Sequence, residues 1–307
     1  MSAMQWIRDP ARTSPCVLVL GMFDGVHRGH QALLERGRAV AAEKGVPLTV
    51  CTFEPHPLEV LRPEAAPPRL TTPMERARRM AECGVDVLCV RTFTAALAAS
   101  EPEAFLDEMT RVFRPVHVIC GYNFSFGHRG RGDGALLTAY AAAHGFTAEV
   151  IPAVTIGGEP VSSTRIRLLV QEGRVSDAAR LLGAAYAIAG RIEHGKRMGH
   201  RLGYPTANVT VPPRKVLPAY GVYSCGLTVR GGEVPAVVNV GRHPTLPEGH
   251  VTIEAHALDP LPELYGEPAR IRFLRFERPE TRFPDADALS EQIGRDLHAA
   301  MVFFGRA

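Results

Sequence analysis

The sequence predicts an α/β fold in two parts, a doubly wound parallel sheet followed by an antiparallel β-barrel with a terminal helix. Two observations predict it. Between residues 16 and 152, short apolar runs alternate five times with helical segments, which is typical of a parallel sheet with helices on both faces. Beyond residue 184, short alternating strands separated by turn residues indicate a small barrel. We therefore expect two domains, 1–184 and 185–307.

The first domain is expected to contain five strands, at 16–20, 48–53, 85–90, 116–120 and 148–152. A helix over 30–44 stops at Gly45, and a last one covers 134–144. Residues 72–75 (TPME) form a capping box for a helix that ends at Gly84, and residues 100–103 (SEPE) read as a second capping box for a helix to Phe113. Loops after the first, second and fourth strands should meet at one edge of the sheet.

The turn after the first strand, residues 21–30 (GMFDGVHRGH), joins a buried strand to a helix N-terminus. Free backbone N–H groups and the helix dipole make such a turn a phosphate site. The spacing fits neither GxxxxGK[ST] nor GxGxxG. His27 and His30 are three residues apart, so both can face one ligand and stabilise charge on a phosphoryl group. A histidine pair that caps the helix, or half of a metal site, is the alternative interpretation.

Two more segments of the first domain carry chemistry. Residues 121–132 (GYNFSFGHRGRG) combine aromatics, an amide and glycines that can clamp a planar ring, although a packed surface turn is equally compatible. Residues 162–167 (SSTRIR) open a helix with hydroxyls that are usually caps. Two arginines in the first turn oppose the helix dipole unless an anion such as a triphosphate is bound there.

In the second domain the expected strands are 187–192, 220–229, 234–240, 251–258 and 271–276, with a hairpin turn at 230–233 and a helix over 287–303. Ser176 is expected to cap a short helix that ends at Gly183. A basic, glycine-rich loop at 195–208 ends in Thr206 and Asn208, whose oxygens suit Mg²⁺. Glu254 is expected to face the barrel interior, where a carboxylate is costly unless it is functional, for example as a general base. A solvated strand face is the alternative.

Composition restricts the function classes. A net charge of +3 over 307 residues, without a basic tail, gives no reason to expect nucleic acid. We expect no membrane span and no secretory signal, because no apolar stretch is long enough. The six cysteines form no CxxC pair, which favours a reducing cytoplasm.

The motifs together resemble one family, the bacterial bifunctional riboflavin kinase/FAD synthetases. The resemblance rests on GxFDGxHxGH at 21–30, TFxPHP at 52–57, GxNFxFGxxxxG at 121–132, SSTxIR at 162–167 and GxxxGxxLGxPTAN at 195–208, in the family's order. It covers residues 14 to 304. His200 departs from the pattern, since an arginine is usual there. The resemblance implies an HxGH-type nucleotidyltransferase domain and a flavokinase barrel, which convert riboflavin to FMN and FMN to FAD with ATP and Mg²⁺.

The resemblance also implies residue roles. The catalytic residues would be His27, His30, Arg167 and Glu254. ATP would contact Gly21, Phe23, Asp24, Gly29, Ser163, Thr164, Gly195, Gly199, Arg201 and Gly203. The flavin would contact Phe53, His56, Pro57, Asn123, Phe126 and Arg278. The Mg²⁺ ligands would be Thr206 and Asn208.

We expect the partners to be small molecules, namely riboflavin, FMN and ATP, with neither nucleic acid nor membrane, and the chain to be a monomer or transient homo-oligomer. Two other functions compete. One is a nucleotidyltransferase with a different acceptor, such as a phosphopantetheine or cytidylyl-transfer enzyme, but the second phosphoryl site argues against it. The other is a flavin-binding or flavin-delivery protein with degenerate catalysis, against which the complete set of expected catalytic residues argues.

Overall fold

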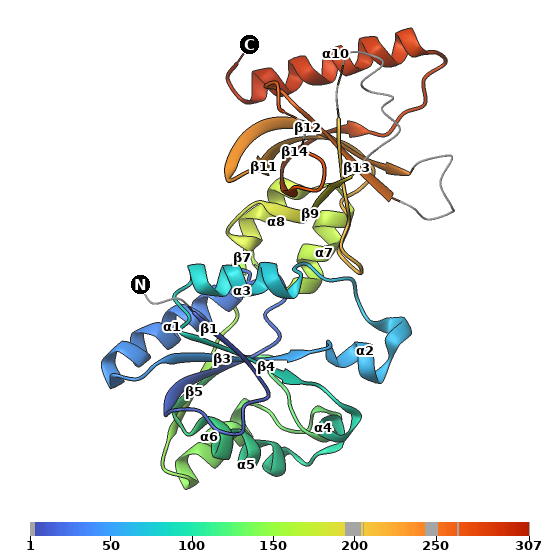
Figure 1. The fold of residues 1–307 in the computed structure, drawn as a ribbon. Helices are drawn as coiled ribbons and strands as arrows, with labels where there is room; N and C mark the ends of the chain where they lie inside the picture. The colour runs from blue at the N-terminus through green and yellow to red at the C-terminus, as the bar shows by residue number, and fades with distance from the viewer. Residues whose placement is uncertain (1–3, 194–203, 205, 243–250, 263, 307) are drawn as a thin grey trace. The chain divides into compact units, whose positions relative to one another are not determined.

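The computed structural model describes residues 4–193, 204, 206–242, 251–262 and 264–306. The chain divides into two compact units, Met1–Ser163 and Thr164–Ala307 (Figure 1). Helices α7 (Ser163–Gln171) and α8 (Val175–Leu182) therefore fall almost entirely in the second unit. The boundary at residue 184 stays a prediction.

The first unit is a six-stranded, all-parallel sheet in the order β1-β4-β3-β2-β5-β6. The strands are β1 (Gln5–Arg8), β2 (Cys16–Leu20), β3 (Leu48–Glu54), β4 (Val87–Thr92), β5 (Pro115–Gly121) and β6 (Thr147–Ile151). The five expected strands are present with small shifts at their ends. β1 was not expected, because it is short and mostly exposed at the edge of the sheet.

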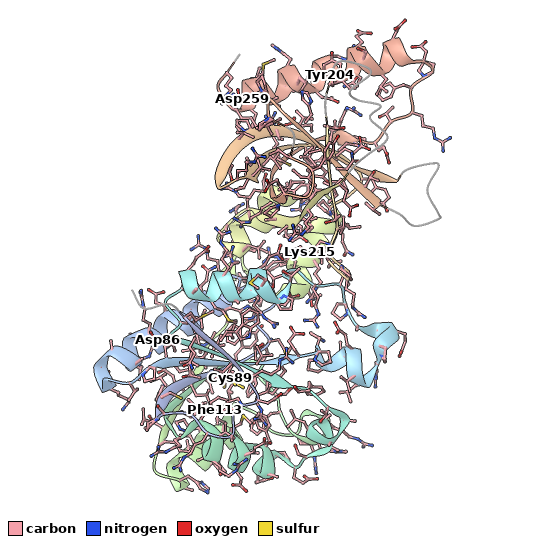
Figure 2. The ribbon with its side chains drawn as sticks, in the orientation of Figure 1. Asp86, Cys89, Phe113, Tyr204, Lys215 and Asp259 are labelled. Atoms are coloured by element: carbon pink, nitrogen blue, oxygen red, sulfur yellow. The ribbon has the colours of Figure 1, made fainter. Side chains whose placement is uncertain are left out.

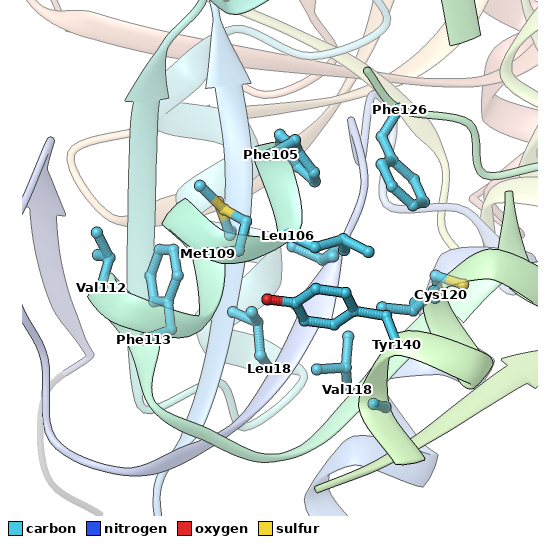
Figure 3. Close-up of a cluster of buried hydrophobic side chains, with 14 of the residues drawn as sticks. Leu18, Phe105, Leu106, Met109, Val112, Phe113, Val118, Cys120, Phe126 and Tyr140 are labelled. Carbon is cyan, nitrogen blue, oxygen red and sulfur yellow. The ribbon is translucent and has the colours of Figure 1, made fainter. Parts of the chain in front are cut away.

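Helices cover both faces of this sheet, which confirms the expected doubly wound fold. They are α1 (Arg28–Lys44), α2 (Pro57–Leu61), α3 (Pro73–Glu82), α4 (Ala95–Ala99), α5 (Pro102–Phe113) and α6 (Gly134–Ala143). Alternate residues of β2 enter opposite cores. Leu18 packs with Phe113 and Tyr140 on the side of α5 and α6 (Figure 3), while Val19 packs with Leu34 on the side of α1.

Two expected helix starts have different outcomes. The capping box of α3 is confirmed: Thr72 Oγ1 accepts from Glu75 N, and the Glu75 carboxylate accepts from Thr72 N. The capping box at Ser100 is wrong. The hydroxyl of Ser100 donates to Leu97 O at 2.7 Å, because this serine ends α4, and α5 begins without a side-chain cap.

The second unit contains a closed barrel in the order β10-β13-β12-β11-β14-β9, with every neighbouring pair antiparallel. Its strands are β9 (Tyr186–Glu193), β10 (Ala207–Val209), β11 (Gly221–Val229), β12 (Gly232–Arg242), β13 (Val251–Ala257) and β14 (Pro268–Pro279). The expected barrel is therefore confirmed, and β10 is an addition to it. Ile188, Tyr223, Val238 and Phe273 fill its interior.

One helix before the barrel strands in sequence and one helix after them pack against the barrel. Ser176 lies inside the first turn of α8, where its hydroxyl donates to Leu274 O of β14 at 2.8 Å, so its expected role as a cap is wrong. The terminal helix α10 (Ala286–Phe303) is followed by Arg306, whose guanidinium pairs with Asp259 at 2.8 Å. Asp259 is labelled in Figure 2. No helix among the described residues has the length and hydropathy that a membrane crossing requires.

Candidate active sites

The first candidate site lies at the carboxyl ends of β2 and β5, where the order in which the chain adds strands to the sheet reverses. From β2 the chain proceeds to β3 and β4 on one side, whereas β5 lies on the other side of β2. Ligands of open parallel sheets bind outside the carboxyl ends of the strands at such a switch point. The turn 21–27 follows β2 and the loop 122–132 follows β5, so the topology brings two expected segments to this place.

The turn after β2 is strained. Phe23 and Val26 have φ values of 55° and 42°, and Gly25 between them has φ 85°. Left-handed backbone is unusual for a bulky residue and especially for a β-branched one. Both side chains are fully buried. Such strain, of order 1–3 kcal/mol per residue, persists only where the surroundings over-determine the conformation.

Protein donors hold the carbonyl oxygens of this turn. Met22 O accepts from Thr52 Oγ1 (3.1 Å) and Arg76 Nη1 (3.2 Å), Phe23 O from Val26 N (3.1 Å), Asp24 O from Ser163 Oγ (2.9 Å) and Val26 O from Gln31 Nε2 (2.8 Å). The first N–H groups of an α-helix have no partner inside the helix. The N–H groups at the start of α1 therefore suit an anion.

His27 and His30 form a stacked pair at the start of α1. Their ring centroids are 3.7 Å apart, with 15° between the planes. His27 caps the helix, since its Nδ1 accepts from His30 N at 3.3 Å. A neutral imidazole whose Nδ1 accepts carries its proton on Nε2. His27 thus caps the helix through Nδ1 and carries its proton on Nε2, so the capping interpretation does not contradict the phosphate interpretation.

His30 is held in its neutral form. Its Nδ1 is buried and has no hydrogen-bond partner among the described residues. Burial, then the neighbouring His27 and Arg76, lower the pKa of His30 well below the usual 6.5. A neutral imidazole has one N–H, so it can donate one hydrogen bond to an anion without adding a full charge. Positive charge at a phosphate must then come from another group.

Asp24 has its carboxylate engaged within the protein. Oδ2 accepts from Leu70 N at 3.0 Å, and Oδ1 accepts from Thr71 N at 3.0 Å and from Thr71 Oγ1 at 3.1 Å. The residue is only 3% exposed. The structure therefore gives this carboxylate a role in shaping the turn. The expected contact of Asp24 with ATP stays a prediction, as do those of Gly21, Phe23 and Gly29.

The residues expected to contact flavin occupy different environments. Phe53 packs against Phe105, and Phe126 packs against the same ring at a centroid distance of 5.2 Å, so both belong to the core. His56 caps α2 by accepting from Leu58 N at 3.2 Å, and Pro57 is the first residue of that helix. Direct contact of these residues with flavin stays a prediction.

After the end of β5, Asn123 is exposed and follows Tyr122, which is 51% exposed. Sequence reasoning counted Tyr122 among the loop aromatics but did not select it. Its position directly after a strand end, where ligands of parallel sheets bind, is the sequence feature that could have selected it.

Residues 163–167 begin α7. Ser163 belongs to the first unit, where its hydroxyl donates to Asp24 O, whereas Thr164 and Arg167 belong to the second unit. Thr164 is exposed and Arg167 is buried. Their expected roles with ATP stay predictions.

The second candidate site lies on the outer face of the barrel. Asn208 of β10 pairs with Glu254 of β13, and Glu254 pairs on its other side with Asn239 of β12. Directly opposite residues of antiparallel strands point to the same face. Ile253 and Ala255, at most 1% exposed, face the interior, so Glu254 does not, and the expectation of an inward carboxylate is wrong.

Thr206 lies two residues before Asn208, on the same face of the chain, and both are partly exposed. A hydroxyl, an amide oxygen and the Glu254 carboxylate are thus brought to one surface. Asn239 was quoted in a motif but not selected, because only strand pairing shows that it flanks Glu254. A carboxylate oxygen of Glu280 lies close to Gly241 on this face, 2.3 Å from where a Cβ would be.

Arg278 has a structural partner. Its guanidinium makes a two-pronged pair with Asp296 of α10, at 2.8 and 2.7 Å, so it fastens the terminal helix to β14. Its contact with flavin stays a prediction. The remaining expected ATP residues, together with the departure at His200, lie outside the described residues: Gly195, Gly199, Arg201 and Gly203.

Comparisons with known proteins match a different family model to each part of the chain. A family model described as FAD synthetase matches residues 9–165, and one described as riboflavin kinase matches residues 182–304. Three curated proteins named bifunctional riboflavin kinase/FMN adenylyltransferase are similar to the whole chain. That of Pseudomonas fluorescens is 40% identical (97% of each chain covered), that of Escherichia coli 39% (94% of this chain, 93% of the relative) and that of Listeria monocytogenes 35% (94% and 93%).

Among solved structures, a Streptococcus pneumoniae protein described as a macrolide-efflux protein superposes with a TM-score of 0.89, at 28% identity over 97% of this chain and 99% of that one. The predicted family is confirmed: from the two matched family models and the extent of identity, the chain belongs to the bifunctional riboflavin kinase/FMN adenylyltransferases.

Proposed function

We propose that this chain makes FAD from riboflavin in two ATP-dependent steps, one at each candidate site. The observation that carries the proposal is the pairing of Asn208 with Glu254 on the barrel, because it provides a second site for phosphoryl chemistry besides the turn after β2. A nucleotidyltransferase with one acceptor has no need of it. The family relationship supports the same reading.

In the barrel, the carboxylate of Glu254 would take the proton from the ribityl 5′-hydroxyl of riboflavin. The hydroxyl oxygen then forms a bond to the γ-phosphorus of ATP, the bond from that phosphorus to the β–γ bridging oxygen breaks, and ADP leaves with FMN. Glu254 is partly exposed beside two amides, so it is accessible to a substrate on the outer face.

Mg²⁺ fits the donors on this face. The hydroxyl of Thr206 and the amide oxygen of Asn208 are hard oxygen ligands of the kind that Mg²⁺ takes together with substrate phosphates. These two residues would hold the ion, which when bound neutralises charge on the phosphates of ATP.

In the first unit, a phosphate oxygen of FMN would form a bond to the α-phosphorus of ATP. The bond from that phosphorus to the α–β bridging oxygen breaks, and pyrophosphate leaves with its electron pair. The FMN phosphate is already nucleophilic, so no protein base is required. His27 and His30 would donate to the α-phosphate, and Ser163 would hold the phosphates that leave.

We place the enzyme in the cytoplasm, as a monomer or transient homo-oligomer that binds small molecules and neither nucleic acid nor membrane. All six cysteines are free thiols, which suits a reducing compartment.

The test is a time course of the purified protein with riboflavin, ATP and Mg²⁺, with the flavins separated by chromatography. FMN that appears first and then converts to FAD is the expected result. FMN that accumulates without FAD would contradict the role of the first unit. Riboflavin that stays bound and unchanged would favour a flavin-binding protein.

A further inference from the structure

The turn after β2 is held from one side by a segment distant in sequence. This segment, residues 70–76, contains the end of a loop and the first turn of α3. It contributes Leu70 N and Thr71 N to the carboxylate of Asp24, and Arg76 Nη1 to Met22 O. The contacts thus reach both flanks of the strained residue Phe23.

Thr71 bridges two groups of the turn through one hydroxyl. Its Oγ1 donates to Asp24 Oδ1 at 3.1 Å and accepts from Gly25 N at 3.0 Å. Thr71 is 8% exposed, so these hydrogen bonds are shielded from water. Gly25 has φ 85° and precedes Val26, the β-branched residue with φ 42°. The hydroxyl therefore fixes the part of the turn that leads directly into His27.

Arg76 is a buried cation, 2% exposed, with a fixed anchor. Its Nη2 pairs with Glu54 at the end of β3, and Arg69 pairs with the same carboxylate at 3.3 Å. With Nη2 anchored, Nη1 reaches Met22 O at 3.2 Å. A planar fork can hold both partners at once, which an ammonium group does less well. The side chain thus connects the end of β3 to the turn.

We propose that Thr71 and Arg76 are positioning residues for adenylyl transfer, which hold the strained turn so that His27, His30 and the N-terminus of α1 meet the α-phosphate of ATP in a fixed geometry. This inference rests on the proposed function of the first unit. Neither side chain needs to touch ATP. A displacement of about 1 Å in a catalytic group can cost about 100-fold in rate.

The first experiment compares Thr71→Val with the wild-type chain in both activities. Valine keeps the shape and removes the hydroxyl, so Asp24 loses a donor and Gly25 N loses an acceptor. We expect kcat/KM for FMN adenylylation to fall about 10- to 100-fold, with a raised KM for ATP. Riboflavin phosphorylation should be unchanged and serves as an internal measure of active protein. Thr71→Ser, which restores the hydroxyl, should recover most of the loss.

The controls separate positioning from simple destabilisation. Thr138→Val removes an exposed helix hydroxyl that donates to Gly134 O of α6, and should leave both activities as in the wild type. A smaller folded fraction lowers kcat for FMN without raising KM for ATP, whereas a misplaced turn changes both. Equal loss in Thr71→Val and Thr71→Ser, or adenylylation within twofold of the wild type in Thr71→Val, would overturn the proposal.

If Thr71→Val unfolds the first unit, the Arg76→Lys variant tests the positioning proposal instead. Lysine keeps the charge near Glu54 but lacks the fork that also reaches Met22 O. We expect KM for ATP to rise at least threefold and kcat to fall, with phosphorylation of riboflavin intact. Wild-type KM and kcat in Arg76→Lys would overturn the proposal. Wild-type chain that forms no FAD from FMN would instead contradict the proposed function itself.

Discussion

Asp24→Asn tests whether the Asp24 carboxylate stabilises the turn after β2 or instead contacts ATP. Asparagine has the same shape, but one of its ends is an NH₂ donor. The carboxylate accepts on both oxygens, from Leu70 N on one and from Thr71 N and Oγ1 on the other. The least costly orientation turns the NH₂ toward Leu70, so one buried N–H loses its acceptor and the two remaining hydrogen bonds lose their charge.

The magnitude follows from these contacts. An unsatisfied buried donor costs about 1–3 kcal/mol, and a hydrogen bond to a charged group is stronger than a neutral one by about 1 kcal/mol. We therefore expect the free energy of unfolding of the first unit to fall by about 3–5 kcal/mol. For a unit of this size that corresponds to a Tm lowered by about 6–20 °C.

The assay is calorimetry, with the transition of the first unit identified by the loss of FMN adenylylation on heating. Thr138→Val, on the exposed face of α6, provides the matched control, with a Tm near that of the wild type. The reasoning is refuted if Asp24→Asn leaves the Tm unchanged and alters only the affinity for ATP, since the carboxylate would then act on the ligand.

Three further results are expected. The free energy of unfolding of the first unit should fall as the pH is lowered from 7 to 5, because unfolded His30 gains a proton near pH 6.5 while folded His30, whose pKa is lowered, stays neutral. Urea unfolding at several pH values in this range should show that the free energy of unfolding of His30→Phe depends less on pH than that of the wild type. An equal pH dependence would contradict the prediction. Asp296→Ala should lower the urea stability of the barrel by about 3–5 kcal/mol, because it leaves Arg278 without its partner, and a loss under 1 kcal/mol would count against the pair as a fastener of α10. Gly132→Ala should reduce FMN adenylylation but spare riboflavin phosphorylation, because a Cβ there would lie 2.4 Å from the ring of Phe126; chromatography of both products checks this, and equal rates with FMN would contradict it.

Local patterns predicted most of the fold. Apolar runs identified the central strands, and the capping box at Thr72 was readable because its hydrogen bonds join residues three apart. β1 and β10 were missed because short strands are defined by their partners in the sheet, which lie far away in the sequence. Ser100 and Ser176 were misassigned because a serine near a helix start has other acceptors within reach.

The candidate sites were predictable in their residue types but not in their geometry. Alternation along β13 shows that Glu254 differs in face from Ile253, but not which face is inside. The contact between Asp24 and Thr71 joins residues 47 positions apart, so no local pattern indicated that the carboxylate is engaged by the protein. Only such nonlocal contacts show which of the residues expected to bind ligand are engaged within the protein.

The central claim, that two separate sites act in succession, is tested most directly by mixing two variants, each defective at one site. Glu254→Gln should fail to phosphorylate riboflavin but convert FMN to FAD, and His27→Ala should accumulate FMN from riboflavin. An equimolar mixture with riboflavin, ATP and Mg²⁺, followed by chromatography, should restore FAD, because the FMN released by one variant is the substrate of the other. A Glu254→Gln protein that still makes FMN, or a mixture that makes none of the expected FAD while each variant retains its other activity, would contradict the account.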